Sequence, residues 1–107
     1  MIQPQNKVEK IILGIDPGTM YMGYGVISVV GTKMKFIDMG ILDLKKEGDT
    51  YMKLKKVYDF TIALIDKFLP DEFAIEAQFF GKNVQSMLKL GRAQGVAIVA
   101  AMERDIP

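Results

Sequence analysis

The chain has 107 residues, which is enough for one sheet-and-helix core but not for two lobes. It contains no cysteine and no histidine, so disulfides, thiolate nucleophiles, imidazole bases and the usual zinc sites are excluded, and any metal must be held by oxygen. The net charge of +1 gives no global argument for nucleic-acid binding, so a basic surface would have to be local.

Residues 1–10 are polar and lack a hydrophobic segment, so they predict a short leader in front of a domain over residues 11–107. No stretch approaches the roughly 20 apolar residues of a membrane span. We therefore expect a soluble, cytoplasmic protein.

The first predicted strand, residues 11–16, reads Ile-Ile-Leu-Gly-Ile-Asp and shows no polar alternation. This pattern is typical of a central strand covered on both faces, and it places Asp16 at the end of the strand. A carboxylate at that position is stabilised by a cation, by the donors of the following turn, or by a capping role. Because Asp-Pro-Gly is also ordinary turn chemistry, Asp16 alone does not separate a binding site from a turn.

Two further strands are predicted over residues 21–30 and 34–44, joined by a turn at Gly31-Thr32, and the three strands would form a meander. Three glycines lie near the expected position of the first strand's acid: Gly18, Gly23 and Gly25. They either let a backbone or a phosphate approach closely or serve turns and bulges.

An amphipathic helix is predicted over residues 51–69, with Asp49 or Thr50 as its N-cap and Pro70 at its end. Its apolar positions recur at steps of three and four: Leu54, Val57, Tyr58, Thr61, Ile62, Ile65, Phe68 and Leu69. The other face mixes both charges: Lys53, Lys55, Lys56, Asp59, Asp66 and Lys67. Mixed charge is typical of solvated surface rather than of a nucleic-acid stripe.

Residues 72–76, Glu-Phe-Ala-Ile-Glu, repeat the design of the first strand, a short apolar run that ends in an acid. A strand-helix-strand crossover would set this strand parallel to and beside residues 11–16, giving the strand order 3-2-1-4. Glu76 would then lie beside Asp16. Two adjacent carboxylates repel each other unless a divalent cation or a proton lies between them, so the pair is more informative than either acid.

The following loop contains Phe79, Phe80 and Lys82, and two aromatic residues before a helix usually form a hydrophobic staple or core plug. A second helix is predicted over residues 84–104, capped by Asn83. It is apolar nearly all round between residues 95 and 102, which indicates burial on more than one side. Small residues would let the sheet or a second subunit approach it: Gly91, Gly95, Ala97, Ala100 and Ala101.

Two runs carry a family resemblance, ILGIDPGTMYMGYGVI and DEFAIEAQFFGKNVQSMLKLGRAQGVAIVAA. Together they resemble RuvC-type Holliday-junction resolvases of the ribonuclease-H-like superfamily, and the resemblance covers residues 11–107. It implies an α/β fold with a ribonuclease-H-like mixed sheet and two main helices. The first run is less specific, because Asp-x-Gly-Thr after a strand also occurs in actin-like ATPases with the same core topology.

The resemblance implies Mg²⁺-dependent nicking of opposed strands of a four-way DNA junction, with Mn²⁺ as a substitute. It makes Asp16 and Glu76 catalytic metal ligands and Phe79 the residue that inserts into or stacks on bases at the crossover. Three basic residues are candidates for DNA contacts, although the last two face either DNA or water: Lys82, Lys89 and Arg92. The resemblance also implies a homodimer with a seam along the second helix, and branch-migration helicases as partners.

RuvC-like enzymes continue into a fifth strand and a last helix with two more acids, commonly spaced Asp-x-x-Asp, which Glu103 and Asp105 do not match. We therefore expect that these 107 residues alone do not cut DNA and that residues 72–76 form an exposed sheet edge that favours self-association. Two other functions stay open: a non-catalytic module for DNA-junction binding or dimerisation, and a fragment of an actin-like ATPase.

Overall fold

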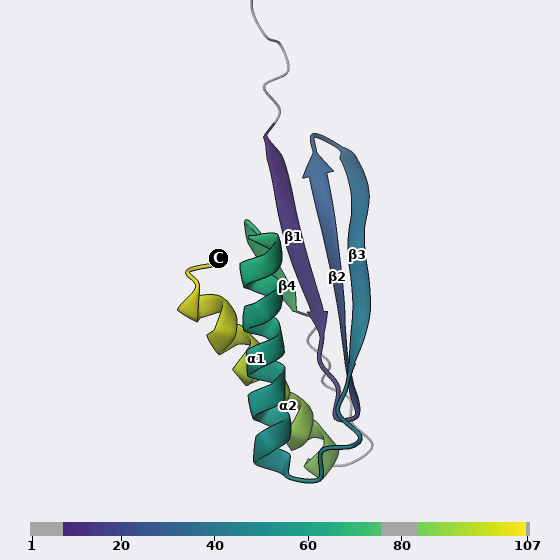
Figure 1. The fold of residues 1–107 in the computed structure, drawn as a ribbon, viewed down its shortest axis with the longest axis vertical. Helices are drawn as coiled ribbons and strands as arrows, with labels where there is room; N and C mark the ends of the chain where they lie inside the picture. Colours follow the sequence, from purple (N-terminus) through teal and green to yellow (C-terminus); the bar gives the residue numbers. More distant parts are fainter. Residues whose placement is uncertain (1–7, 76–83, 107) are drawn as a thin grey trace, which may run out of the picture.

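The computed structural model describes residues 8–75 and 84–106, in which a four-stranded sheet packs against two helices (Figure 1). The elements follow in the order β1 (Glu9–Asp16), β2 (Tyr21–Val30), β3 (Lys33–Asp43), α1 (Thr50–Phe68), β4 (Glu72–Ile75) and α2 (Val84–Glu103). The strand order is β3-β2-β1-β4, which confirms the predicted α/β mixed sheet.

The strand register sets which side chains share a face of the sheet. β1 and β2 are antiparallel with Leu13 opposite Val26, and β1 and β4 are parallel with Ile15 opposite Ile75. β1 begins two residues earlier than expected, because Glu9 and Lys10 pair with the far end of the long second strand. The predicted leader therefore does not extend to residue 10.

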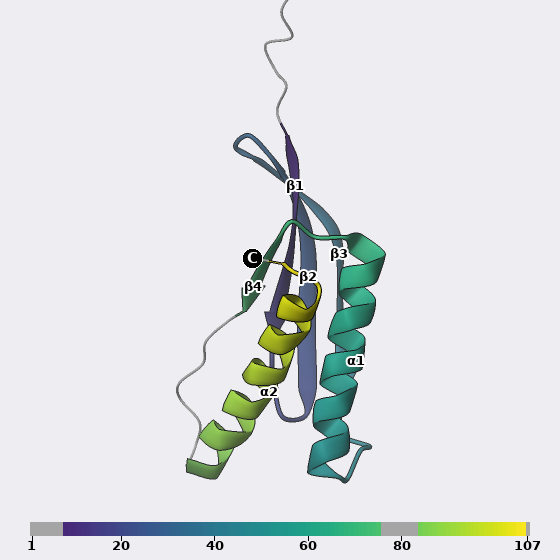
Figure 2. The ribbon, with the colours of Figure 1, turned by 90° about the vertical axis from the view of Figure 1, so that its left-hand side faces the viewer.

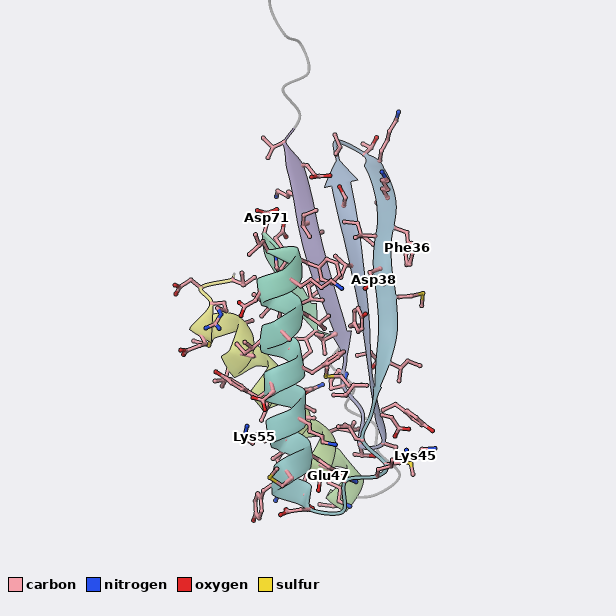
Figure 3. The ribbon with its side chains drawn as sticks, in the orientation of Figure 1. Phe36, Asp38, Lys45, Glu47, Lys55 and Asp71 are labelled. Atoms are coloured by element: carbon pink, nitrogen blue, oxygen red, sulfur yellow. The ribbon has the colours of Figure 1, made fainter. Side chains whose placement is uncertain are left out.

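Both helices lie on one face of the sheet, as Figure 2 shows from the helix side. The strands send Leu13, Ile15, Met22 and Val26 to this face, where they form one buried cluster with residues of α1 and α2. Every second residue of each strand points to the opposite face. No described segment covers that second face, where Phe36 points away from the helices (Figure 3).

Helix α1 begins as the sequence predicts, because the Asp49 side chain accepts a hydrogen bond of 2.8 Å from the backbone N–H of Tyr51. It ends where Leu69 adopts a left-handed conformation with φ of 48°. The apolar stripe was predicted with two errors. Leu64 is buried although it was left out, and Leu69 is exposed because the chain has already left the helix at that residue.

Within the single chain, helix α2 packs against the core with one side, and the second side that the sequence predicts to be buried stays exposed there. Its small residues face the core: Ala93, Ala97, Ala100 and Ala101. Its larger residues Ile98, Val99 and Met102 remain 42–67% exposed in the single chain. Among the described residues, neither helix has the length and apolarity needed to cross a membrane.

Candidate active site

Asp16 is the last residue of β1 and is exposed on the face that the helices leave open. It pairs with Gly23 of β2, while its neighbour Ile15 points into the core and pairs with Ile75 of β4. Ile15 and Ile75 directly precede Asp16 and Glu76 in the sequence. The structure therefore aligns the ends of β1 and β4, the two strands that the sequence predicts to lie side by side. Glu76 itself lies outside the described residues.

The start of β4 is fixed on β1 by Asp71. Its backbone N–H donates a hydrogen bond of 2.7 Å to the carbonyl oxygen of Ile11, and its side chain accepts one of 2.8 Å from the backbone N–H of Ile11. Lys10 and Glu72 add an ion pair of 3.0 Å across the same two strands. These contacts hold a strand of only four residues in register, and register decides which residues meet at the strand ends.

A groove of about 550 Å³ runs over the open face of the sheet beside Asp16. Four of its lining residues are glycines: Gly14, Gly23, Gly25 and Gly40. A Cβ atom at Gly23 would lie 3.8 Å from the Cβ of Asp16, and one at Gly25 would have no neighbour within 4 Å. Packing within the chain therefore tolerates a side chain at both positions, and the lack of one leaves the approach to Asp16 open.

Gly18 has a different reason to be glycine. A Cβ atom there would overlap the backbone carbonyl oxygen of Tyr21, so the turn between β1 and β2 closes only without one. The turn is also tied to the end of β3, because the backbone N–H of Leu44 donates a hydrogen bond of 2.8 Å to the carbonyl oxygen of Met20. Of the three glycines singled out in the sequence, Gly18 thus builds the turn and Gly23 and Gly25 line the groove.

Tyr24 also lines the groove and is no candidate for a base at neutral pH. Its hydroxyl donates a hydrogen bond of 3.0 Å to Asp38. Desolvation, followed by this hydrogen bond and the charge of Asp38, raises the pKa of Tyr24. Within the described parts of the chain, no three acidic side chains converge on one point. Asp16 is the acidic residue that lines the groove.

Lys89 and Arg92 lie one turn apart on α2, and both are exposed. The structure brings them to one pocket of about 270 Å³ together with Lys53 of α1 and the turn residues Gly18 and Thr19. Sequence reasoning missed Lys53, which it assigned to the solvated face of α1. The available signal was its spacing, since Lys53 lies one helical turn before the buried Val57.

The remaining predicted site residues fall outside the described part of the chain: Glu76, Phe79 and Lys82, with the cap residue Asn83. Their predicted roles stay predictions.

A family model for the crossover junction endodeoxyribonuclease RuvC matches residues 12–107. The chain belongs to the RuvC family. A RuvC of Bacteroides fragilis is 64% identical over 107 residues, which make up 100% of this chain and 56% of that protein. A RuvC of Porphyromonas gingivalis is 61% identical over 99 residues, or 92% of this chain and 52% of that protein. The chain thus spans about half the length of these relatives.

One solved structure of the same family shares this fold. A Thermus thermophilus RuvC in complex with a Holliday junction substrate superimposes with a TM-score of 0.82 and 26% identity, over 92% of this chain and 61% of that one. A PPX-GPPA enzyme of Aquifex aeolicus reaches a TM-score of 0.52 at 12% identity, over 90% of this chain and 33% of that one. The second likeness shows the shared fold alone.

Proposed function

We propose that this RuvC family member acts as a Holliday-junction resolvase, a metal-dependent endonuclease that nicks opposed strands of four-way DNA junctions in recombination and repair, in the cytoplasm. The observation that carries the proposal is the parallel register of β1 and β4. It pairs Ile15 with Ile75 and so aligns two strand ends that are each followed by an acid. The Thermus thermophilus RuvC solved with a Holliday junction supports the choice of substrate.

The residues present fit a magnesium site. Asp16 offers an exposed carboxylate beside an open groove, and the sequence has no cysteine or histidine that would favour a softer metal. Asp16 and Glu76 would hold Mg²⁺, or Mn²⁺ in its place. When bound, the ions supply the positive charge that stabilises an in-line phosphodiester displacement. The protein's part is to fix both carboxylates at neighbouring strand ends.

The same proposal assigns the DNA contacts. Phe79 would stack on bases at the crossover, which holds a distorted step without reading its sequence. Lys82, Lys89 and Arg92 would contact phosphates. The two described members of this set, Lys89 and Arg92, lie at the end of the domain where α1 and α2 begin and where the turn after Asp16 lies.

A homodimer is the assembly that we propose for the full enzyme, because two active sites suit a two-fold-symmetric junction. The outward side of α2 supports this assembly. Ile98, Val99 and Met102 form an exposed apolar stripe there, and exposed apolar surface of this kind marks interaction sites. Branch-migration helicases would be further partners of the complete protein.

The second candidate function is a non-catalytic junction-binding or dimerisation module. It is supported by Lys89 and Arg92, which line one pocket and would bind DNA whether or not a strand is cut. An actin-like ATPase fragment is disfavoured, because the family model that matches residues 12–107 is that of RuvC.

A side-by-side binding assay tests the proposal. The chain is titrated against a labelled four-way junction, a linear duplex of the same arms and a labelled adenine nucleotide, all with Mg²⁺. We expect tighter binding of the junction than of the duplex, no binding of the nucleotide and no nicks from these 107 residues. Nucleotide binding without junction binding would favour the ATPase alternative, and symmetric nicks would contradict the need for further carboxylates.

A further inference from the structure

The pocket that contains Lys89 and Arg92 has a composition that the proposed metal site does not explain. It lies between the turn that follows β1, the first turns of α1 and the middle of α2. Its basic residues are Lys53, Lys89 and Arg92, and no aspartate or glutamate lines it. Beneath them lie the buried apolar side chains Leu44, Val57 and Ala93. The pocket therefore combines an apolar floor with a cationic rim.

The three cations of this rim are not neutralised within the described chain. The ion pairs of the described residues use other bases: Lys10 with Glu72, Lys55 with Asp59, Lys56 with Glu47, and Arg104 with Asp66. Lys53 differs in this respect from its neighbours on α1, since Lys55 and Lys56 each have a carboxylate partner. Like charges around one cavity repel one another, and they raise the local concentration of anions.

The size of the pocket indicates what kind of anion it accepts. Its volume of about 270 Å³ falls just below the roughly 300–1,000 Å³ of pockets that enclose a complete small ligand. Part of a longer ligand fits better than a whole nucleotide. A sugar-phosphate unit matches the lining, because its phosphate suits the basic rim and its sugar carbons suit the apolar floor. The hydroxyls of Thr19 and Thr50 add donors of the kind that commonly contact phosphate oxygens.

We infer that this pocket binds a phosphate of the DNA backbone that lies next to the phosphate at the cleavage site. Lys53 contacts this neighbouring phosphate together with Lys89 and Arg92. The inference rests on the proposed function, because it takes DNA as the ligand. Gly18 and Thr19 line the pocket and follow Asp16 in the same turn. A phosphate held here thus fixes the position of the strand relative to Asp16 without reading its sequence.

The test compares Lys53→Gln with two matched variants of the same chain. Lys67→Gln makes the same charge change on the same helix, 14 residues or about 21 Å further along. Lys53→Arg keeps the positive charge. Binding of a synthetic four-way junction and of its linear duplex is measured between 50 and 200 mM salt, after circular dichroism has confirmed that each variant is folded.

We expect Lys53→Gln to weaken binding of both DNAs and to flatten the plot of log affinity against log salt by about 0.9, the loss of one phosphate contact. The loss of DNA affinity in Lys53→Gln, relative to the parent chain, should therefore become about 3.5-fold smaller between 50 and 200 mM salt. Lys67→Gln and Lys53→Arg should keep the parent slope. Titration with inorganic phosphate separates a site for free anions from a DNA subsite, which should bind the junction far more tightly.

Three results would overturn the inference. Equal slopes for Lys53→Gln and Lys67→Gln would show that Lys53 contacts no phosphate, while junction binding and the proposed function would survive. A Lys53-dependent response to inorganic phosphate with unchanged DNA binding would identify a free-anion site instead. A chain that binds no DNA at all would end both the inference and the proposed function.

Discussion

The two faces of the sheet are built from the same strands and have opposite character. On the helix side, Leu13 and Val26 are fully buried. On the open side, Met34 and Ile41 of β3 are each 70% exposed, and Asp16 lies beside a groove lined with glycines. Successive residues of a strand alternate between faces, so β1 contributes Ile15 to the core and Asp16 to the site.

Residues that stabilise the fold therefore alternate along one strand with residues of the candidate site. The covered face holds the hydrophobic core that fixes the strand order and the register. The open face carries the carboxylate, and Gly23 and Gly25 beside it are tolerant positions rather than packing requirements. Substitutions on the covered face are therefore expected to change folding, and substitutions on the open face to change ligand binding.

The largest effect is expected at Leu13. Replacing Leu13 by alanine removes a fully buried side chain in a central strand, and we expect a loss of about 2–5 kcal/mol in the free energy of unfolding. Phe36→Ala is the control on the open face, where the side chain is 62% exposed (Figure 3), and it should change that free energy by less than about 0.5 kcal/mol. Urea denaturation measures both. Equal losses would remove the distinction between the two faces.

A second pair of variants compares the stability effect of a side chain at a turn glycine and at a groove glycine. Gly18→Ala introduces a Cβ atom into the Tyr21 carbonyl oxygen, so the turn must shift, and we expect a loss of about 1–3 kcal/mol. Gly25→Ala meets no atom within 4 Å and should be close to neutral in stability. Thermal melting followed by circular dichroism gives both values. A neutral Gly18→Ala would contradict the description of the turn as closed by steric contact.

The smallest effect concerns pH and belongs to the helix layer alone. Arg104 donates a hydrogen bond of 2.9 Å to Asp66, which lowers the pKa of that carboxyl. A depressed pKa in the folded state adds stability above the unfolded pKa, and this contribution is lost as the pH falls below about 4. Asp66→Asn should flatten the acid limb of the melting-temperature profile slightly. Both groups are exposed, so a steep change would contradict the assignment.

Much of the architecture followed from local sequence patterns. Three features have a short-range cause in the sequence: the apolar strand that ends at Asp16, the Asp49 cap and the crossover through α1. Together they predicted the strand order β3-β2-β1-β4. The start of β1 was misplaced because its first residues are polar and are held only by pairing with β2. Cross-strand pairing of this kind leaves no periodic signal in the sequence.

The candidate site was predicted less completely. Asp16 was recognised because an acid at the end of an apolar strand is conspicuous. The pocket around Lys53 was missed, because it depends on how α1 packs against α2 and the β1–β2 turn. Which side of α2 packs on the sheet was also left open. Alanines that reach the core and larger residues that face outward give the same apolar pattern in the sequence.

The central claim is that Asp16 and Glu76 hold a metal at adjoining strand ends, and a Mn²⁺ titration followed by nuclear magnetic resonance tests it most directly. We expect weak binding, with paramagnetic broadening centred on the two acids and on the neighbouring ends of β1 and β4. Asp16→Asn should abolish the broadening. Broadening that persists in Asp16→Asn, or that centres on Asp43 and Asp49, would contradict the account.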